Sequence, residues 1–298
     1  MEIIEFNYGD KLNENKKLIL CLGFFDGVHL GHQYIINQSK KEGYKIGVLT
    51  YDHSPSYFIQ EKEERYLTSI SDKAEYFESL GVDYLYLMHF EKSTLLITKD
   101  EFIQNVISQI NPVICSCGDD HRFGVRGEGD PNYLRHFYEV NSFPLLTKDE
   151  HKVSSRDIIS LLKEGNIEEV NLLLGRPYRV NGVVVDGLHN GRKIDFPTAN
   201  LALNYPYVYP KVGVYIGYAE VRGKTYKAII SVGTHPTISP IADPIIEVNL
   251  LDFNQNIYGK DIFVYFIKHI RDEKRFENLE ELKKQLQKDT MTAKKHLQ

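Results

Sequence analysis

The sequence of 298 residues has no tryptophan, only three cysteines and no long run of apolar residues. Because a membrane-spanning helix needs an apolar run of about 18 residues or more, we expect no membrane partner. The first residues are acidic where a secretory signal peptide carries basic and then apolar residues. We therefore expect a cytoplasmic protein.

The three cysteines, Cys21, Cys115 and Cys117, are odd in number and lie in apolar surroundings. Cys115 and Cys117 are separated by one residue, whereas redox and zinc pairs use two, and no second pair completes a zinc site. Disulfides also persist mainly in oxidising compartments. We interpret all three as reduced residues of a hydrophobic core.

An excess of positive charge is also missing. The 36 Lys and Arg residues against 41 Asp and Glu residues leave a net charge of -5. A general nucleic-acid binder needs a basic surface that releases phosphate counterions, so we expect no nucleic-acid partner. Nothing in the sequence indicates an oligomeric state.

The apolar runs that are present divide the chain into two parts, as a length of roughly 150 residues per domain also predicts. In the first part, short strands alternate with helical stretches, which is typical of a parallel sheet with helical crossovers. Ligands of such sheets bind beyond the carboxyl ends of the strands. We expect strands at 18–24, 45–51, 83–90 and 113–118, and helices at 31–43, 72–81 and 101–110.

After two predicted helices at 155–175, the pattern changes to many short alternating runs separated by Gly, Asn or Pro. This pattern predicts an antiparallel sheet or barrel. A final amphipathic helix is expected over 277–289, with Leu279, Leu282 and Leu286 on one face. The expected fold is an α/β Rossmann-like domain, residues 1–175, followed by an antiparallel β-barrel domain with a C-terminal helix, residues 176–298.

The segment FFDGVHLGH, residues 24–32, follows a predicted strand and begins a helix. His29 and His32 are three residues apart, so they share a face in the first helical turn. The N–H groups and the dipole of that turn attract phosphate, and two imidazoles can donate hydrogen bonds to charge that develops on an α-phosphate. The alternative is a helix cap with two incidental histidines.

This segment resembles the nucleotidyltransferase motif of the bacterial bifunctional riboflavin kinase/FMN adenylyltransferases, also called FAD synthetases. The resemblance continues through YLTSISDKAEYFESLGVDYL, GDDHRFG and KVSSRDIISLL, and it covers nearly the whole chain. It implies a nucleotidyltransferase domain in which His29 and His32 are catalytic. The further residues that it implies for binding ATP and its phosphates are Gly23, Asp26, Gly31, Ser154 and Ser155.

Several positions depart from the family's pattern in this domain. Phe24 stands where the family has Asn, and Ser54 stands where it has the His of a Pro-His-Pro motif. Ile159 replaces an Arg of the second triphosphate grip, and isoleucine cannot make the charge-assisted bonds of arginine. Arg156 adds a cation within the same turn. We therefore expect adenylyl transfer to be weaker than phosphorylation.

The most distinctive stretch of the second half is GLHNGRKIDFPTANL. A loop with Gly187 and Gly191 can wrap a phosphate chain, and Arg192 can neutralise it. Thr198 and Asn200 offer the hard oxygen ligands that Mg²⁺ accepts beside water and phosphate. From the residues alone, a turn followed by the start of a strand is the favoured interpretation.

The same stretch resembles the defining motif of riboflavin kinases, Gly-Arg-x-x-Gly-Phe-Pro-Thr-Ala-Asn. The resemblance implies that Thr198 and Asn200 hold Mg²⁺ together with ATP. One position differs, because Asp195 stands where the family has Gly. A carboxylate there repels ATP phosphates unless it points away or joins the metal ligands.

Glu247 and Asn249 alternate with Ile246 and Val248, so the two polar residues share one strand face. On alternation alone, Glu247 faces solvent. The family's catalytic Glu lies in the same segment, which implies that Glu247 is the base that activates the 5′-hydroxyl of riboflavin. Arg271 corresponds to a family Arg near the flavin; the alternative is a surface arginine that caps a strand end.

The resemblance implies a flavin-cofactor enzyme that uses Mg²⁺ and has riboflavin, FMN and ATP as partners. Such an enzyme is expected to phosphorylate riboflavin to FMN in the barrel domain and to adenylylate FMN to FAD in the α/β domain. Two alternatives stay open: a riboflavin kinase with a degenerate adenylyltransferase domain, and a non-catalytic flavin- or nucleotide-binding regulator.

Overall fold

The computed structural model describes residues 1–12, 16–60, 64–148, 151–185, 196–234 and 243–297. The chain divides into two compact units, Met1–Ser155 and Arg156–Gln298. The sequence predicts the domain boundary after Gly175, whereas the structure divides earlier, after Ser155. The boundary is earlier because helix α8 (Ile167–Leu174) packs against the barrel strands β9 (Tyr178–Val185) and β14 (Asp261–Arg271).

The first unit consists of a parallel sheet and the helices that connect its strands. The strands are β1 (Glu2–Asn7), β2 (Leu18–Leu22), β3 (Lys45–Tyr51), β4 (Tyr84–His89), β5 (Ile114–Gly118) and β6 (Glu139–Phe143). The helices and helical turns are η1 (Asp26–Val28), α1 (Leu30–Ser39), α2 (Pro55–Gln60), α3 (Ile70–Ser79), η2 (Lys92–Leu96), α4 (Lys99–Phe102), η3 (Ile103–Ile107), α5 (Ser108–Ile110), η4 (Val125–Gly127) and α6 (Pro131–Leu134). A short hairpin of β7 (Thr147–Lys148) and β8 (His151–Lys152) follows.

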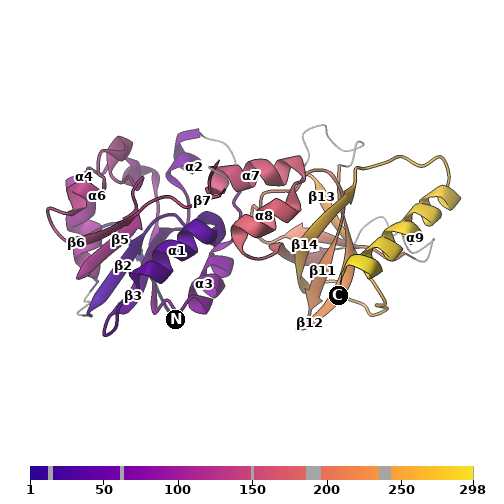
Figure 1. Ribbon diagram of the computed structural model, residues 1–298, viewed down its shortest axis with the longest axis horizontal. Coiled ribbons are helices and arrows are strands. Elements are labelled where there is room, and N and C mark those ends of the chain that lie inside the picture. Colours follow the sequence, from indigo (N-terminus) through magenta and orange to yellow (C-terminus); the bar gives the residue numbers. More distant parts are fainter. Residues whose placement is uncertain (13–15, 61–63, 149–150, 186–195, 235–242, 298) are drawn as a thin grey trace. The chain divides into compact units, whose positions relative to one another are not determined.

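The six strands are ordered β1-β4-β3-β2-β5-β6, with helices on both faces (Figure 1). Strand β2 is buried throughout its length. Ile19 and Cys21 belong to one apolar cluster, whereas Leu18, Leu20 and Leu22 belong to another, because successive side chains point to opposite faces. The Rossmann-like fold predicted for this part of the chain is confirmed.

The two edge strands of this sheet, β1 and β6, were not predicted. In β1, only Phe6 is fully buried, and β6 has no fully buried residue. An edge strand pairs on one side only and tolerates charged residues, so its apolar pattern is weaker than that of a central strand. The acidic start of the chain is therefore an edge strand that pairs with β4.

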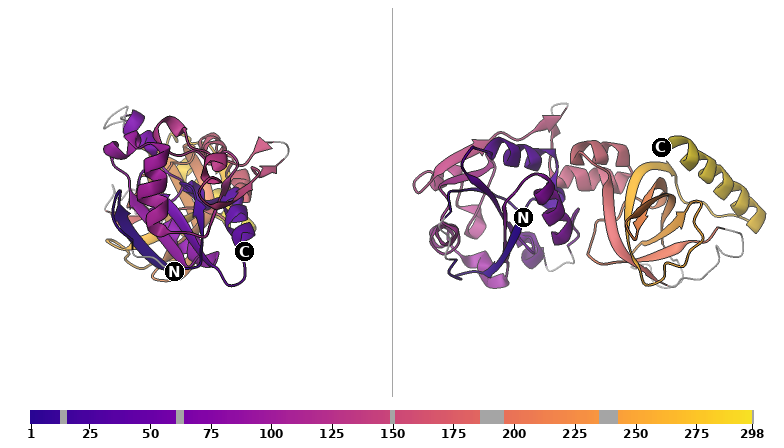
Figure 2. Two further views of the ribbon diagram at one scale, coloured as in Figure 1. Left: turned by 90° about the vertical axis from the view of Figure 1, so that its left-hand side faces the viewer. Right: turned by 90° about the horizontal axis from the view of Figure 1, so that it is seen from below.

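The second unit is the predicted antiparallel barrel, closed in the order β10-β13-β12-β11-β14-β9. Its strands, apart from β9 and β14, are β10 (Ala199–Leu203), β11 (Gly213–Val221), β12 (Lys224–Gly233) and β13 (Ile245–Leu250). Apart from α8, its helices are α7 (Ser155–Glu164), whose first residue is the last of the first unit, and α9 (Leu279–His296), which lies beside the barrel (Figure 2). Val214, Ile216 and Ile229 on the outside of the barrel pack with Ala293 and Leu297 of the C-terminal segment.

The three cysteines are free and buried, as interpreted from the sequence. Burial raises the pKa of the Cys21 and Cys117 thiols to about 12, so they stay protonated and unreactive. Within the described residues, no helix combines the length and the apolar character that crossing a membrane requires.

Candidate active sites

The first candidate site is the turn between β2 and α1, which carries the two predicted catalytic histidines. Phe25, Gly27 and Val28 have φ angles of 55°, 79° and 39°, in the left-handed region. Such angles cost a residue other than glycine on the order of 1–3 kcal/mol, and they persist only where surrounding contacts hold the chain. The shape of this turn therefore depends on its neighbours.

Asp26 makes several of the contacts that hold this turn. Its buried carboxylate accepts hydrogen bonds from the backbone N–H of Leu67 at 3.0 Å and of Thr68 at 3.2 Å, and from the Thr68 hydroxyl at 3.2 Å. The same hydroxyl accepts a bond from the N–H of Gly27 at 2.9 Å. Asp26, predicted to help bind ATP, thus ties the turn to the segment before α3.

His29 and His32 lie together at the start of α1. Their rings stack with centroids 3.6 Å apart, and His29 Nδ1 accepts a hydrogen bond from the backbone N–H of His32 at 3.4 Å. His29 is the N-cap of the helix, so the cap offered above as an alternative is present. The capping geometry itself brings the two imidazoles to a helix N-terminus.

The two glycines predicted near the phosphates make room for rings of the turn. A Cβ on Gly31 would lie 3.2 Å from the His29 ring, and a Cβ on Gly23 would lie 3.0 Å from the Phe25 ring. Either contact is tight enough to displace the ring. The lack of a side chain at these two glycines therefore allows the rings of His29 and Phe25 to occupy their observed positions.

The segment predicted to be a second triphosphate grip also contacts the turn. The Ser155 hydroxyl donates to the backbone carbonyl of Asp26 at 2.9 Å, and Ser154 precedes it as a half-buried residue. In the same helix, α7, Arg156 directly follows Ser155 and is exposed, whereas Ile159 is half-buried.

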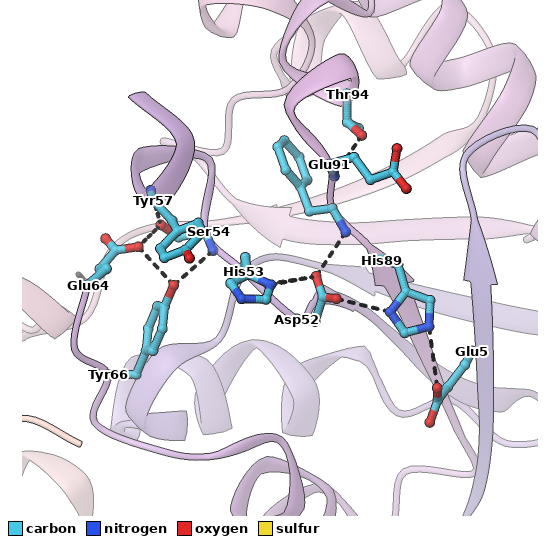
Figure 3. A network of polar contacts seen from close by, with 11 residues as sticks. Glu5, Asp52, His53, Ser54, Tyr57, Glu64, Tyr66, His89, Glu91 and Thr94 are labelled. Atoms are coloured by element: carbon cyan, nitrogen blue, oxygen red, sulfur yellow. Dashed lines mark hydrogen bonds and ion pairs between the residues drawn. The ribbon is translucent and has the colours of Figure 1, made fainter. Parts of the chain in front are cut away.

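A network of polar side chains lies at the carboxyl ends of β3 and β4 (Figure 3). Asp52 accepts a hydrogen bond from the N–H of Phe90 at 2.8 Å, bonds His89 Nδ1 at 3.0 Å and lies 3.3 Å from His53 Nδ1. His89 Nε2 is in turn 3.3 Å from Glu5. Burial raises the pKa of Asp52, but the bonds from Phe90, His89 and His53 outweigh it and hold that pKa below its usual value.

Ser54, one of the departures from the family's pattern, belongs to the other part of this network. The hydroxyls of Ser54, Ser56 and Tyr66 all donate to the carboxylate of Glu64. The Ser54 N–H donates to the Tyr66 hydroxyl at 3.3 Å, and the Tyr66 ring lies 5.6 Å from the ring of Phe24. Two of the substituted positions are therefore connected through Tyr66.

The second candidate site is a cavity of about 320 Å³ between the outer face of the barrel and α9. It brings together three of the predicted residues, Thr198, Glu247 and Arg271. Phe196 and Phe276 also line it and offer aromatic surface for a planar ligand. The opposite wall consists of the three leucines predicted to share one face of the last helix, Leu279, Leu282 and Leu286.

Strand register explains why these residues meet. Glu247 in β13 pairs with Asn200 in β10 on one side and with Ser231 in β12 on the other. Ser231 pairs with Val214 in β11, which pairs with Arg271 in β14. Directly opposed residues of antiparallel strands place their side chains on the same face. A row of side chains therefore crosses the outer face of the barrel from Asn200 to Arg271.

The predicted alternation in β13 is correct, but the solvent-facing position expected from alternation alone is wrong. Ile246 and Val248 are buried inside the barrel, and Glu247 is on the outer face. That face is covered by α9, so Glu247 is half-buried and lines the cavity. A strand's alternation identifies a face, whereas a helix elsewhere in the chain decides whether water reaches it.

Asn249 has a structural task that the sequence did not indicate. Its Nδ2 donates to the backbone carbonyl of Pro197 at 2.7 Å, which fixes the residue before Thr198. The other predicted phosphate residues of this half, Gly187, Gly191 and Arg192, lie outside the described residues, as does Asp195.

Comparisons with known proteins match both units. Residues 11–160 match a family model described as FAD synthetase, and residues 174–297 match one described as riboflavin kinase. A bifunctional riboflavin kinase/FMN adenylyltransferase of Bacillus subtilis is 37% identical over 292 residues, covering 94% of this chain and 92% of that protein. This chain belongs to the bifunctional riboflavin kinase/FMN adenylyltransferase family.

Other relatives extend the same finding. The bifunctional riboflavin kinase/FMN adenylyltransferase of Escherichia coli K12 is 33% identical over 290 residues, covering 93% of this chain and 91% of that protein. A solved structure from Streptococcus pneumoniae, titled a macrolide-efflux protein, has a TM-score of 0.90 and 30% identity, with 99% of both chains covered. The likeness in fold therefore extends over both units.

Within the riboflavin kinase unit, the sequence missed a partner of Arg271. Arg271 Nη2 and Nε donate to the carboxylate of Asp289 in α9, at 2.8 Å and 3.1 Å. Asp289 is buried and also accepts a bond from Gln285 at 2.9 Å. Arg271 therefore lines the cavity and fastens α9 to the barrel, and it is not the surface arginine offered as the alternative.

Arg271→Met is expected to destabilise the riboflavin kinase unit by about 3 kcal/mol, because it leaves the buried carboxylate of Asp289 without its cation. Arg271→Lys should restore only part of the stability, since an ammonium cannot make the two-pronged bond of a guanidinium. Thermal unfolding measures the effect. Lys288→Met, at an exposed lysine of α9, is the control, and an equal loss in this control would contradict the assignment.

Proposed function

We propose that this enzyme phosphorylates riboflavin to FMN in its barrel unit and adenylylates FMN to FAD in its α/β unit. The observation that carries the proposal is the cavity that gathers Thr198, Glu247 and Arg271 beneath α9. The names of the relatives support both activities. The comparisons give no support to either alternative, the kinase with a degenerate first domain or the non-catalytic regulator.

In the kinase step, Glu247 takes the proton of the riboflavin 5′-hydroxyl as that oxygen attacks the γ-phosphate of ATP, and ADP leaves. A neutral hydroxyl needs such a base, and a carboxylate in a half-enclosed cavity can supply it. Arg271 lies in the same cavity, and we assign it to contact with the flavin. Phe196 and Phe276 line that cavity, and we assign them to packing on the isoalloxazine ring.

The donors near Glu247 fit Mg²⁺. Thr198 and Asn200 carry neutral oxygens, and Asn200 is directly opposite Glu247 in the sheet. In the described parts of the chain, no three His, Cys, Asp or Glu residues gather as a metal cluster. Mg²⁺ accepts a site with few protein oxygens, where phosphates and water supply its other ligands. When bound, it would neutralise charge on the ATP phosphates.

In the adenylyl transfer, the phosphate of FMN attacks the α-phosphate of ATP and pyrophosphate leaves. The attacking phosphate is already anionic, so this step needs no base. His29 and His32 donate hydrogen bonds to the charge on the α-phosphate, aided by the N-terminus of α1. We assign the binding of the ATP triphosphate to Gly23, Gly31, Ser154 and Ser155, with Asp26 holding the turn in shape.

The decisive experiment is incubation of the full chain with riboflavin, ATP and Mg²⁺, followed by chromatography of the flavins. Formation of FAD requires both activities. FMN alone would leave a kinase whose first unit is inactive, and unchanged riboflavin would leave a binding protein. We expect FAD to form more slowly than FMN, because Phe24 and Ile159 have replaced side chains that donate hydrogen bonds in the family.

Thr198→Ala and Asn200→Ala are each expected to lower kcat/KM for Mg-ATP in the kinase reaction by about tenfold or more, since each removes a ligand oxygen. Adenylylation of supplied FMN should be unchanged, because the two units have separate cores. Both activities are measured on the same preparation. Loss of both activities without unfolding would contradict the assignment of two separate sites.

A cytoplasmic location is part of the proposal. It is supported by the three free, buried cysteines, because a protein of an oxidising compartment is more often stabilised by disulfides. Riboflavin, FMN and ATP are the partners that this assignment requires, and nucleic acid is not among them.

A further inference from the structure

Lys73 is a charged residue in the core of the first unit, and the roles assigned above do not use it. It lies on α3, and only 1% of its surface is exposed. Its ammonium donates a hydrogen bond to the backbone carbonyl of Phe24 at 2.8 Å and lies 3.8 Å from the centre of the Phe24 ring. Thr50 donates to the same carbonyl at 2.8 Å. Lys73 therefore fixes the point at which the chain leaves β2 and enters the turn.

Lys73 is also the cation that acts on Asp26. Burial raises the pKa of Asp26, and the charge of Lys73 opposes that effect more than any hydrogen bond does. Conversely, burial lowers the pKa of Lys73 to about 8, against the charges of Asp26 in η1 and Asp52 after β3. The two buried charges compensate each other directly before the helix N-terminus that carries His29 and His32.

From these contacts we infer that Lys73 is a positioning residue for adenylyl transfer, a role that rests on the function proposed above. It holds the left-handed turn of Phe25 and Val28 through the Phe24 carbonyl, and it cancels the charge of Asp26 beside the triphosphate. Without the ammonium, the turn loses a contact that maintains its unfavourable backbone angles. The Asp26 carboxylate is then also left uncompensated where an anionic ligand must bind.

Lys73→Met is expected to raise the KM for ATP in FMN adenylylation by about tenfold or more and to lower kcat as well. The reason is that the variant leaves the Asp26 charge uncompensated where ATP binds and removes a contact that holds the turn. Riboflavin phosphorylation in the same preparation should stay within about twofold of wild type. Lys73→Arg keeps the charge and should recover much of the activity. Lys92→Met, at an exposed lysine of the same unit, is the matched control and should leave both activities unchanged.

Two further measurements separate this role from a purely structural one. Adenylylation by wild type should fall as the pH rises through about 8, where Lys73 loses its proton. In Lys73→Arg, that fall should be absent, because a guanidinium stays protonated. If Lys73→Met does not fold, the profiles of wild type and Lys73→Arg still test the inference.

A double variant tests the pairing with Asp26. Lys73→Met combined with Asp26→Asn should bind ATP better than Lys73→Met alone, because no uncompensated carboxylate remains. Unchanged KM and kcat in Lys73→Met, or identical pH profiles of wild type and Lys73→Arg, would overturn the inference. Absence of FAD formation by wild type would instead overturn the proposed function.

Discussion

Glu247→Gln is expected to lower the rate of riboflavin phosphorylation by about 10²-fold or more while leaving the binding of riboflavin and ATP intact. A carboxamide has nearly the same shape as the carboxylate, but it cannot take the proton of the attacking hydroxyl. A 10²-fold loss corresponds to about 2.7 kcal/mol in the barrier. Steady-state kinetics with the KM values of both substrates, together with titration of riboflavin binding, measures the effect.

The control is Glu220→Gln in the same barrel. Glu220 lies on β11, accepts a hydrogen bond from the Tyr265 hydroxyl at 3.0 Å and does not line the cavity. Its variant should phosphorylate riboflavin at the wild-type rate. A normally folded Glu247→Gln with undiminished turnover would show that another group accepts the proton.

His32→Ala is expected to lower the formation of FAD from FMN by about 10²–10³-fold, the loss typical of removing one donor to transition-state charge. His29→Ala should have a similar effect and should also cost about 1 kcal/mol of stability, because His29 caps α1. Assays of FAD and pyrophosphate from FMN and ATP measure the loss. Riboflavin phosphorylation should be unchanged in both variants, since Glu247, Thr198 and Asn200 belong to the other unit.

Asn37→Ala is the matched control for the histidine variants. Asn37 is an exposed residue of the same helix and accepts a hydrogen bond only from the surface residue Lys40, at 2.8 Å. Its variant should make FAD at the wild-type rate. If His32→Ala also kept the wild-type rate, the histidine pair would be a helix cap without a part in the chemistry.

The sequence predicted the elements that are buried on both faces more reliably than those at the edges. Strands β2, β3, β4 and β5 are close to their predicted positions, because continuous apolar runs identify central parallel strands. The edge strands β1 and β6 carry too little apolar signal and were missed. The predicted last helix is real, but α9 extends to His296, beyond the leucine pattern that indicated it.

Lys73 could have been noticed from its spacing. It is four residues before Phe77 on α3, so the two side chains share a helix face, and both are buried. A lysine on a buried face indicates that a carboxylate compensates its charge, but helical spacing does not identify the residue that carries this carboxylate. The partner, Asp26, comes from a turn far away along the chain.

By itself, the sequence indicated which side chains are candidates for the chemistry: a histidine pair at the start of a helix, oxygen ligands after a proline, and a glutamate on an alternating strand. The tertiary structure alone decided how those side chains are held and covered. It places α9 over Glu247, joins Asp289 to Arg271, and ties Asp26 to Thr68 across 42 residues. Local patterns encode the face on which a residue lies, because they follow the period of a helix or strand. Contacts between distant segments depend on how the elements pack, and no local period records them.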